Sequence, residues 1–295
     1  MKNTDNKLKP LIGAKASNRI GNAFVYVVLV AMTLVWLFPY VGILLESFRV
    51  ESTHPVGYLI PQKFGFDNYI NLFTVTGNRN FPRWFVNTTI MGVCTAVLQT
   101  FFILSMSYTL SRLRFNGRKL LMNFMLILGM FPGFLSLILI YREFAKAGLT
   151  EEMAPVGLVI VYCASSGMGY YVSKGFFDTI PKSLDEAARV DGATRWQIFW
   201  QVIMPLSKPI IIYTILMGFM APWGDFMLAR YMAHNTPEGM NVAVGMWDML
   251  RGVEASDNYT MFCAAGVVVS LPVTAVFLSL QKYYVEGVTG GAVKG

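Results

Sequence analysis

Few residues in this 295-residue sequence have the types and spacing that chemistry requires. The sequence has no G-x-x-x-x-G-K-[ST] phosphate loop, no G-x-S-x-G nucleophile turn and no H-E-x-x-H metal pair. Its two histidines, His54 and His234, lie in polar connections, and its three cysteines form no C-x-x-C pair. We therefore expect that the chain is not an enzyme and that it binds no metal or cofactor of its own.

The segment 174–208 has the most informative spacing. Ser183 and Glu186 have the S-x-x-E spacing of a capping box, which predicts a helix that begins at Leu184. Gly192 can adopt the left-handed conformation that ends a helix. The first half of the segment is therefore predicted to form one short helix followed by a turn.

A second short helix should follow the turn. Thr194 and Gln197 repeat the box as T-x-x-Q, and Pro205 should end this helix. Apolar residues at i, i+3, i+4 and i+7 give it one strongly apolar face, which consists of Trp196, Phe199, Trp200 and Ile203. Ala187 and Ala188 give the first helix a low-profile surface. We expect both helices to lie under a membrane.

Long apolar runs make up most of the chain and must position this segment. Hydrophobic residues are 55% of the sequence and charged residues 14%, against about 25% charged in soluble domains. A bilayer-spanning helix needs about 20 apolar residues. We predict an all-α integral membrane protein with six transmembrane helices, the fifth interrupted by Asp225. The predicted spans are 20–45, 84–111, 120–141, 153–173, 209–229 and 258–281.

The distribution of basic residues predicts the orientation of the chain. Both termini, the connection 112–119 and the segment 174–208 hold most of the 24 basic residues. We therefore expect both termini to be cytoplasmic, with a basic tail at 1–19, a transmembrane domain at 20–284 and a second tail at 285–295. The loops 46–83 and 225–257 should face outward. The sparse charges offer no solvated basic face for nucleic acid.

The segment 174–208 resembles a loop of binding-protein-dependent ABC importer permeases. The pattern of that loop is E-A-A-x-x-x-G, then nine residues of any type, then I-x-L-P. Val202 and Met204 replace the usual Ile and Leu, which are mild apolar exchanges. Residues at matching positions are Glu186, Ala187, Ala188, Asp191, Gly192, Ala193 and Pro205.

Other stretches are similar to the maltose/maltodextrin type within the carbohydrate branch of this family. The C-terminal stretch 287–295 resembles the tail of that type. The stretch Trp223-Gly-Asp225-Phe226 and the Phe131-Pro132-Gly133 break also resemble it. The resemblance covers almost the whole chain.

The resemblance implies a type I ABC importer permease fold in a bacterial cytoplasmic membrane. It implies a second related permease, two copies of a cytoplasmic ATPase that holds ATP and Mg, and an extracellular sugar-binding protein. The loop around Glu186 to Gly192 would dock into the ATPase and couple hydrolysis to transport. Glu186 would meet a basic group there, although it can instead cap its own helix.

Two further contacts are implied by the resemblance. The C-terminal tail, with Thr289, Gly290, Lys294 and Gly295, would reach the ATPase, unless it is an ordinary frayed terminus. The last outer loop would probe the binding protein, unless it is an ordinary acidic loop. Its candidate probe residues are Gly252, Glu254, Ser256 and Asp257.

The expected cargo is an oligosaccharide, with a maltodextrin as the first guess and a galacto-oligosaccharide, another glucan fragment or glycerol phosphate as further options. Sugar contacts cannot be assigned from the sequence. Asp225, near one span end, marks either a functional group or the membrane boundary. A self-contained secondary sugar carrier is the alternative, although it would need ionisable groups within the spans and usually an internal repeat. A membrane enzyme is a third and weaker option.

Overall fold

A computed structural model describes residues 14–51, 57–74, 80–130, 133–165, 167–251 and 258–292. These residues are almost entirely helical, and they contain no strand longer than one isolated bridge between Arg49 and Phe64. The all-α prediction is confirmed for this described part of the chain.

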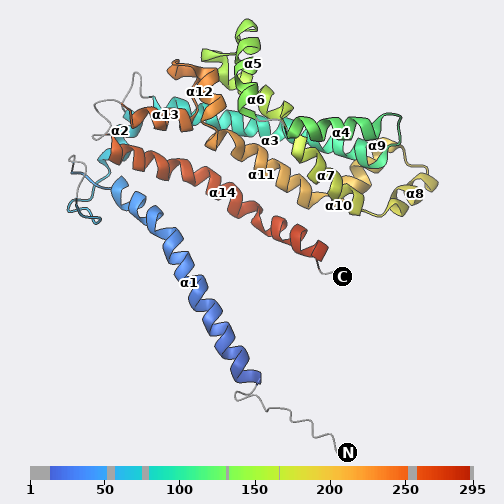
Figure 1. The fold of residues 1–295 in the computed structure, drawn as a ribbon, viewed down its shortest axis with the longest axis horizontal. Helices are drawn as coiled ribbons and strands as arrows, with labels where there is room; N and C mark the ends of the chain where they lie inside the picture. Colours follow the sequence, from blue (N-terminus) through green and yellow to red (C-terminus); the bar gives the residue numbers. More distant parts are fainter. Residues whose placement is uncertain are drawn as a thin grey trace, which may run out of the picture.

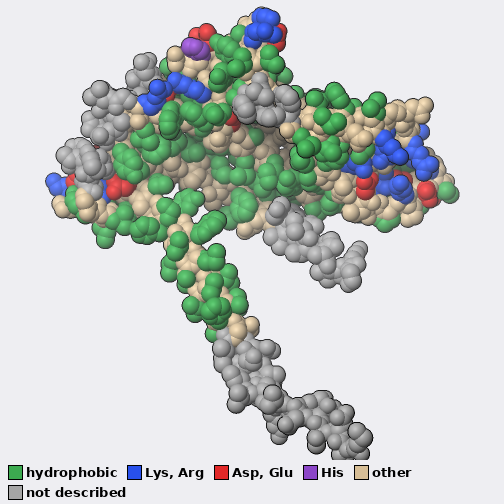
Figure 2. Space-filling model, in the orientation of Figure 1, with side chains coloured by type: hydrophobic (Ala, Val, Ile, Leu, Met, Phe, Trp, Pro, Cys, Tyr) green, Lys and Arg blue, Asp and Glu red, His purple; other side chains and the backbone are tan. Residues whose placement is uncertain are grey.

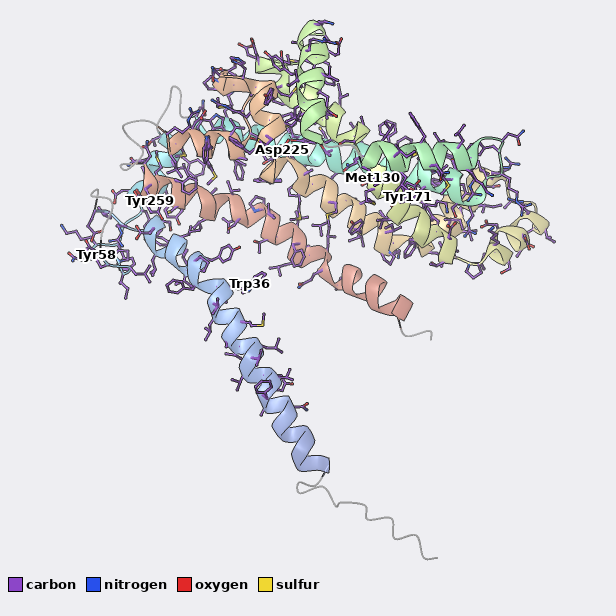
Figure 3. The ribbon with its side chains drawn as sticks, viewed as in Figure 1. Trp36, Tyr58, Met130, Tyr171, Asp225 and Tyr259 are labelled. Carbon is purple, nitrogen blue, oxygen red and sulfur yellow. The ribbon has the colours of Figure 1, made fainter. Side chains whose placement is uncertain are left out.

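The first helix, α1 (Ala14–Ser47), separates from the rest of the molecule along most of its length (Figure 1). Its apolar stretch Gly21–Ser47 is long enough to cross a membrane, yet none of the most apolar window is buried within the chain. Trp36, which is 71% exposed, lies where the helix has left the remaining helices (Figure 3). This apolar surface therefore needs a cover that the chain itself does not supply.

The body of the molecule is built on three long helices. These are α3 (Phe81–Arg112), α11 (Lys208–Gly224) and α14 (Tyr259–Ala292). The helix α3 packs closely against α11, because a Cβ at Gly218 would lie only 3.0 Å from Ala96 Cα. Small residues at such crossings let membrane helices approach each other.

Shorter helices pack around this body. They are α2 (Asp67–Thr74), α4 (Arg118–Gly129), α5 (Gly133–Lys146), α6 (Ala154–Ala164), α7 (Gly167–Thr179), α8 (Lys182–Val190), α9 (Arg195–Gln197), α10 (Met204–Leu206), α12 (Met227–Ala233) and α13 (Val242–Met249). Short 3₁₀ turns at η1 (Glu151–Met153) and η3 (Pro237–Gly239) and a π-helical turn at η2 (Ile198–Ile203) complete the described elements.

Two hydrophobic clusters hold the body together. The larger includes Trp84, Trp223 and Met232, and it joins α3 and α11 to α12 and α13. The smaller joins α3, α7 and α11 to the α8–α10 segment through buried side chains such as Phe177 and Ile203. Basic side chains gather at the end of the molecule that holds α8, whereas hydrophobic side chains cover much of the remaining visible surface (Figure 2).

The number of membrane-spanning helices differs in detail from the prediction. Three described helices, within α1, α3 and α14, are long and apolar enough to span a membrane. Two bent pairs raise that number to five if each pair forms one span. One pair joins α5 to α6 through η1 with a bend of 111°, and the other joins α9–α10 to α11 with a bend of 81°.

Three predicted spans are not continuous helices. The span 120–141 is divided into α4 and α5, with α5 starting at Gly133 directly after Pro132, a residue that disrupts a helix interior. The span 153–173 is divided into α6 and α7 after Ser165. The span 209–229 ends at Gly224, because Asp225 has an extended backbone.

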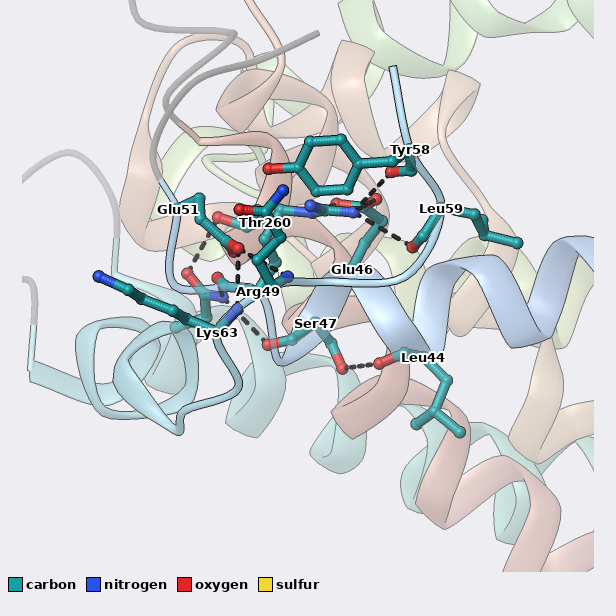
Figure 4. A network of polar contacts seen from close by, with 11 residues as sticks. Leu44, Glu46, Ser47, Arg49, Glu51, Tyr58, Leu59, Lys63 and Thr260 are labelled. Carbon is teal, nitrogen blue, oxygen red and sulfur yellow. Dashed lines mark hydrogen bonds and ion pairs between the residues drawn. The ribbon is translucent and has the colours of Figure 1, made fainter. Parts of the chain in front are cut away.

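A buried arginine fixes the segment between α1 and α2 (Figure 4). Arg49 forms two hydrogen bonds of 2.8 Å with the Glu46 carboxylate. It also donates to the carbonyl oxygens of Tyr58 and Leu59, and its guanidinium lies 4.9 Å from the Tyr58 ring centroid. This network holds Tyr58 and Leu59 against the end of α1.

The same network connects to α2 and α14. The Asn68 amide donates to the carbonyl oxygens of Ser47 and Arg49, and it accepts a hydrogen bond of 2.9 Å from Thr260. The ends of α1 and α14 are thereby tied together at one end of the molecule, although α1 diverges further along (Figure 1).

Candidate functional site

The helix α8 begins earlier than the sequence predicts. Its first residue is Lys182 and its N-cap is Pro181, and no side chain caps it. The predicted capping box between Ser183 and Glu186 is therefore wrong. Pro181 already directs the chain into the helix, since its φ of −57° and ψ of 132° match the entry to a helix. Glu186 consequently lies beyond the first turn, and its exposed carboxylate is free of a capping role.

The end of α8 agrees with the prediction. Gly192 has φ of +84°, and its N–H donates to the Arg189 carbonyl at 3.0 Å. The Ala193 N–H donates to the Ala188 carbonyl at 2.9 Å. Together these bonds form a Schellman motif, which needs a left-handed residue at the glycine position. Ala188 and Ala193 both pack against the smaller hydrophobic cluster, so the turn is fixed to the body of the molecule.

The second capping box is confirmed. Thr194 Oγ1 accepts from the Gln197 N–H at 3.3 Å, and Gln197 Oε1 accepts from the Thr194 N–H at 2.8 Å. Pro205, however, lies inside α10 and does not end the helix. The chain instead bends after Leu206, where Ser207 Oγ donates to the Ile203 carbonyl at 2.7 Å.

The π-helical turn divides the predicted apolar face. Phe199 and Ile203 are buried, whereas Trp196 is 67% and Trp200 46% exposed. A π turn inserts an extra residue into the helical repeat, so residues that share one face of an α-helix are rotated apart. The two tryptophans therefore remain on the surface beside α8.

The residues predicted to couple lie on two sides of α8. Glu186, Ala187, Asp191 and Gly192 are exposed, whereas Ala188 and Ala193 are partly buried, and Pro205 is exposed within α10. The helix also presents two exposed apolar side chains, Leu184 at 39% and Val190 at 87%. Ala187 and its apolar neighbours form a surface with no partner among the described residues, which suits docking to another protein.

Sequence reasoning missed the side chain that joins α8 to α3. Asp185 is buried, and its Oδ2 lies 3.4 Å from Nε of Arg112, in the last turn of α3. Arg112 also donates to the Ile180 carbonyl at 2.8 Å. Asp185 precedes Ala188 by three residues, so both lie on the inward face of the helix. This spacing could have predicted that Asp185 faces inward, although not that Arg112 is its partner. Asp185 and Arg112 therefore join α8 to the end of α3.

A second polar contact joins α3 to α7, next to the contact between α3 and α8. Ser111 donates to Asp178 Oδ1 at 2.6 Å, and Lys174 forms an ion pair with Asp178. Burial would raise the pKa of Asp178, but the hydrogen bonds from Lys174 and Ser111 outweigh it and hold the pKa below its usual value. The joint between α3 and α7 thus depends on a charged carboxylate.

Asp225 has a structural role at the junction of several helices (Figure 3). Tyr162 donates to its Oδ2 at 2.6 Å, and the Leu228 N–H donates to its Oδ1 at 3.2 Å. The Asn241 amide donates to the Asp225 carbonyl at 2.7 Å. The carboxylate therefore caps the start of α12 and holds α6 beside it.

The other predicted contacts lie mostly outside the described residues. This holds for the probe residues Gly252, Glu254, Ser256 and Asp257, and for Lys294 and Gly295. Thr289 and Gly290 lie on the last turns of α14, which continues as a helix to Ala292, and the predicted cytoplasmic position of the stretch 285–295 stays a prediction. Among the described residues, no group of three or more His, Cys, Asp and Glu could hold a metal ion.

The long apolar helices and the exposed α8 describe a membrane protein with a surface open to a partner. Residues 102–290 match the family described as binding-protein-dependent transport system inner membrane component. The chain belongs to this family, and it is an inner membrane component of a bacterial ABC transporter.

Relatives that match almost the full length of the chain are permeases of sugar transport systems. The chain is 32% identical over 286 residues to the galactooligosaccharides transport system permease protein GanQ of Bacillus subtilis, covering 97% of this chain and 100% of that protein. It is 30% identical to the maltodextrin transport system permease protein MdxG of the same organism, covering 96% and 100%. It is 31% identical to the maltose/maltodextrin permease MalG of Escherichia coli, covering 88% and 91%. The resemblance to carbohydrate-branch permeases is thereby confirmed.

A solved structure shares the fold. A chain of a bacterial ABC transporter involved in the import of the acidic polysaccharide alginate superimposes with a TM-score of 0.75 at 23% identity, covering 94% of this chain and all of that one. A chain from an alginate transporter in complex with an alginate pentasaccharide-bound periplasmic protein gives a TM-score of 0.58 at 16% identity.

Proposed function

We propose that this chain is the permease subunit of an ATP-driven importer that translocates an oligosaccharide delivered by an extracellular binding protein. The observation that carries the proposal is the exposed surface of α8 around Glu186 and Ala187, joined to α3 through Asp185 and Arg112. Such a joint can pass the movement of a docked ATPase to a membrane-spanning helix. ATP and Mg would be held by two copies of that ATPase, and this chain would provide no catalytic group.

A second permease subunit would cover α1. The apolar window of α1 has no buried residue within the chain, and its exposed side chains include Phe24, Trp36 and Phe38. Lipid covers such a helix on one side, and a related subunit would cover the other. In this arrangement the sugar path lies between the two permeases, so this chain alone presents only part of it.

The orientation follows from the basic residues around α8. The α8 end holds Arg112, Arg114 and Arg189, and the positive-inside rule supports a cytoplasmic position for it. The C-terminal end of α14 points toward the same side of the body (Figure 1). The Arg49 network at the opposite end would face outward, toward the binding protein.

The proposed cargo is a maltodextrin-like oligosaccharide. MdxG and MalG are named for maltodextrin or maltose, whereas GanQ is named for galactooligosaccharides. The chain is about equally similar to relatives named for either sugar, with identities of 30 to 32%. The experiment therefore includes both a maltodextrin and a galacto-oligosaccharide.

Purification of the tagged chain from its native membranes tests the proposal. Mass spectrometry should identify a second permease and an ATPase among the co-purifying proteins. Sugar-loaded binding proteins should then raise ATP hydrolysis, and the maltodextrin-loaded one should raise it most. Stimulation by galacto-oligosaccharide alone would correct the cargo. A chain that purifies alone and takes up sugar in liposomes under an ion gradient would instead establish the secondary carrier.

A further inference from the structure

A charged cleft of about 430 Å³ lies between α8, the end of α3 and the start of α9. Only one of its lining residues, Leu113, is apolar. Asp185 and Glu186 contribute two negative charges. Five basic side chains line it, namely Arg112, Arg114, Lys182, Arg189 and Arg195. The cleft therefore has an excess of three positive charges.

Buried charged atoms in the wall of the cleft lack partners. Arg112 and Asp185 have side-chain exposures of only 2% and 8%. Within the described part of the chain, Nη1 of Arg112 and Oδ1 of Asp185 form no hydrogen bond. Buried polar atoms without partners are costly, so the contact between Arg112 and Asp185 leaves bonding capacity unfilled in the wall of the cleft.

The cleft borders the proposed docking surface of α8 and shares Glu186 with it, but it does not include Ala187. Lys182, Asp185, Glu186 and Arg189 follow i, i+3, i+4 and i+7, which places them along one side of the helix. Ala187 lies on the other side. A ligand in the cleft and a protein on Ala187 can therefore be bound together. The positive-inside rule explains why basic residues occur here, but it does not explain why they enclose a cleft.

We propose that this cleft binds a phosphate-bearing anion. Arginine guanidinium groups match the geometry of phosphate oxygens, and several of them surround one space here. The exposed Trp196 and Trp200 on the neighbouring helix are the side chains that anchor a protein in the headgroup layer, so an anionic lipid headgroup is one source. A soluble phosphate ester is the other. An anion bound there would fix the angle of α8 against α3.

The test uses the full chain purified in a neutral detergent. Inorganic phosphate is added at constant ionic strength, with chloride as the reference, and the melting temperature is measured. In parallel, native mass spectrometry counts the molecules of phosphatidylglycerol retained, with zwitterionic phosphatidylcholine as the reference. Stabilisation by phosphate without retention of phosphatidylglycerol identifies a soluble ester as the source, and both effects together identify a phosphate site that also takes the lipid. Retention of phosphatidylglycerol without a phosphate effect identifies the lipid.

Matched variants assign the binding to the cleft. The pair Arg189→Ala and Arg195→Ala should weaken binding about tenfold or more, equivalent to about 1.4 kcal/mol. The pair Lys119→Ala and Lys208→Ala removes the same charge from exposed positions outside the cleft and should leave binding within about twofold. Arg189→Lys with Arg195→Lys should retain much of the binding, which separates lost charge from lost folding. Absence of both bindings in the unaltered chain, or an equal loss in the control pair, would overturn the proposal.

Discussion

The two ends of the molecule each contain a buried arginine, but the two are held very differently. Arg49 has a fully buried side chain and donates to both oxygens of Glu46 and to two backbone carbonyls. Its network also connects α1 to α2 and α14. This end is a fixed joint, since a bidentate pair with additional acceptors restricts the guanidinium to one position.

Arg112 at the other end has a looser environment. Its contact with Asp185 is 3.4 Å long, and a single hydrogen bond goes to the Ile180 carbonyl. Among the described residues, both Nε and Nη1 of Arg112 lack a hydrogen-bond partner, whereas in Arg49 only Nη1 does. The comparison indicates that the proposed outer end holds its arginine with four hydrogen bonds, whereas the α8 end holds its arginine with one and leaves more of its donors unpaired.

The largest expected effect is on the fixed joint. Arg49→Ala leaves the Glu46 carboxylate without its bidentate partner and should lower the free energy of unfolding by about 3–5 kcal/mol. Arg112→Ala should cost clearly less, because fewer bonds are lost. Denaturant unfolding of both variants in detergent measures the difference. Equal losses of stability would show that the two arginines are held alike.

The second effect is on transport. Ala187→Trp places a bulky side chain on the exposed face of α8, so sugar-stimulated ATP hydrolysis should fall to the basal rate while the melting temperature is unchanged. Reconstituted importer in liposomes provides the assay. Normal uptake by this variant would remove α8 from the coupling pathway.

Ala188→Trp is the control for Ala187→Trp, because it makes the same substitution at the neighbouring alanine. Ala188 packs against the smaller hydrophobic cluster, so overpacking there should also lower the free energy of unfolding by about 1–3 kcal/mol. Loss of transport together with stability at Ala188, but of transport alone at Ala187, would show that the two alanines have separate roles.

The short-range features of the α8 segment could be predicted from sequence, because they depend on neighbouring residues. The left-handed Gly192 and the Thr194 capping box are both present. The start of α8 was misjudged because Pro181 directs the chain into the helix before the Ser183 box can act. The pairing of Asp185 with Arg112 was beyond local reasoning, since it joins residues that are distant in the sequence.

The spans show a similar limit. Absence of charge identifies apolar segments, but it does not tell whether a segment is one straight helix. The break between α4 and α5 coincides with Pro132 and was visible as a sequence feature, whereas the separation of α6 from α7 after Ser165 carried no such signal. Hydropathy also could not reveal that α1 leaves the body, because burial against a neighbour depends on tertiary packing.

A smaller effect is expected at the turn after α8. Gly192→Ala places a Cβ on a residue with φ of +84° and should cost about 1–2 kcal/mol, which alters the angle between α8 and α9. Thermal unfolding measures the cost. Gly175→Ala serves as the control, because Gly175 lies within α7 and a Cβ added there would meet no atom within 4 Å. An unchanged melting temperature for Gly192→Ala would mean that the turn tolerates a different conformation.

The smallest effect concerns acid pH at Asp178. Its folded pKa lies below the unfolded value of about 3.9, so its contribution to stability is present above that value and is lost as the pH falls through the lower folded pKa. Asp178→Asn removes this titration. The variant should therefore be slightly less stable than the unaltered chain at neutral pH, and the difference should shrink as the pH falls below about 4. Melting temperatures across that range measure it. A difference that stays constant with pH would show that the Asp178 charge does not strengthen the joint between α3 and α7. The contacts of α3 with α7 would then be as weakly held as the contact between Arg112 and Asp185.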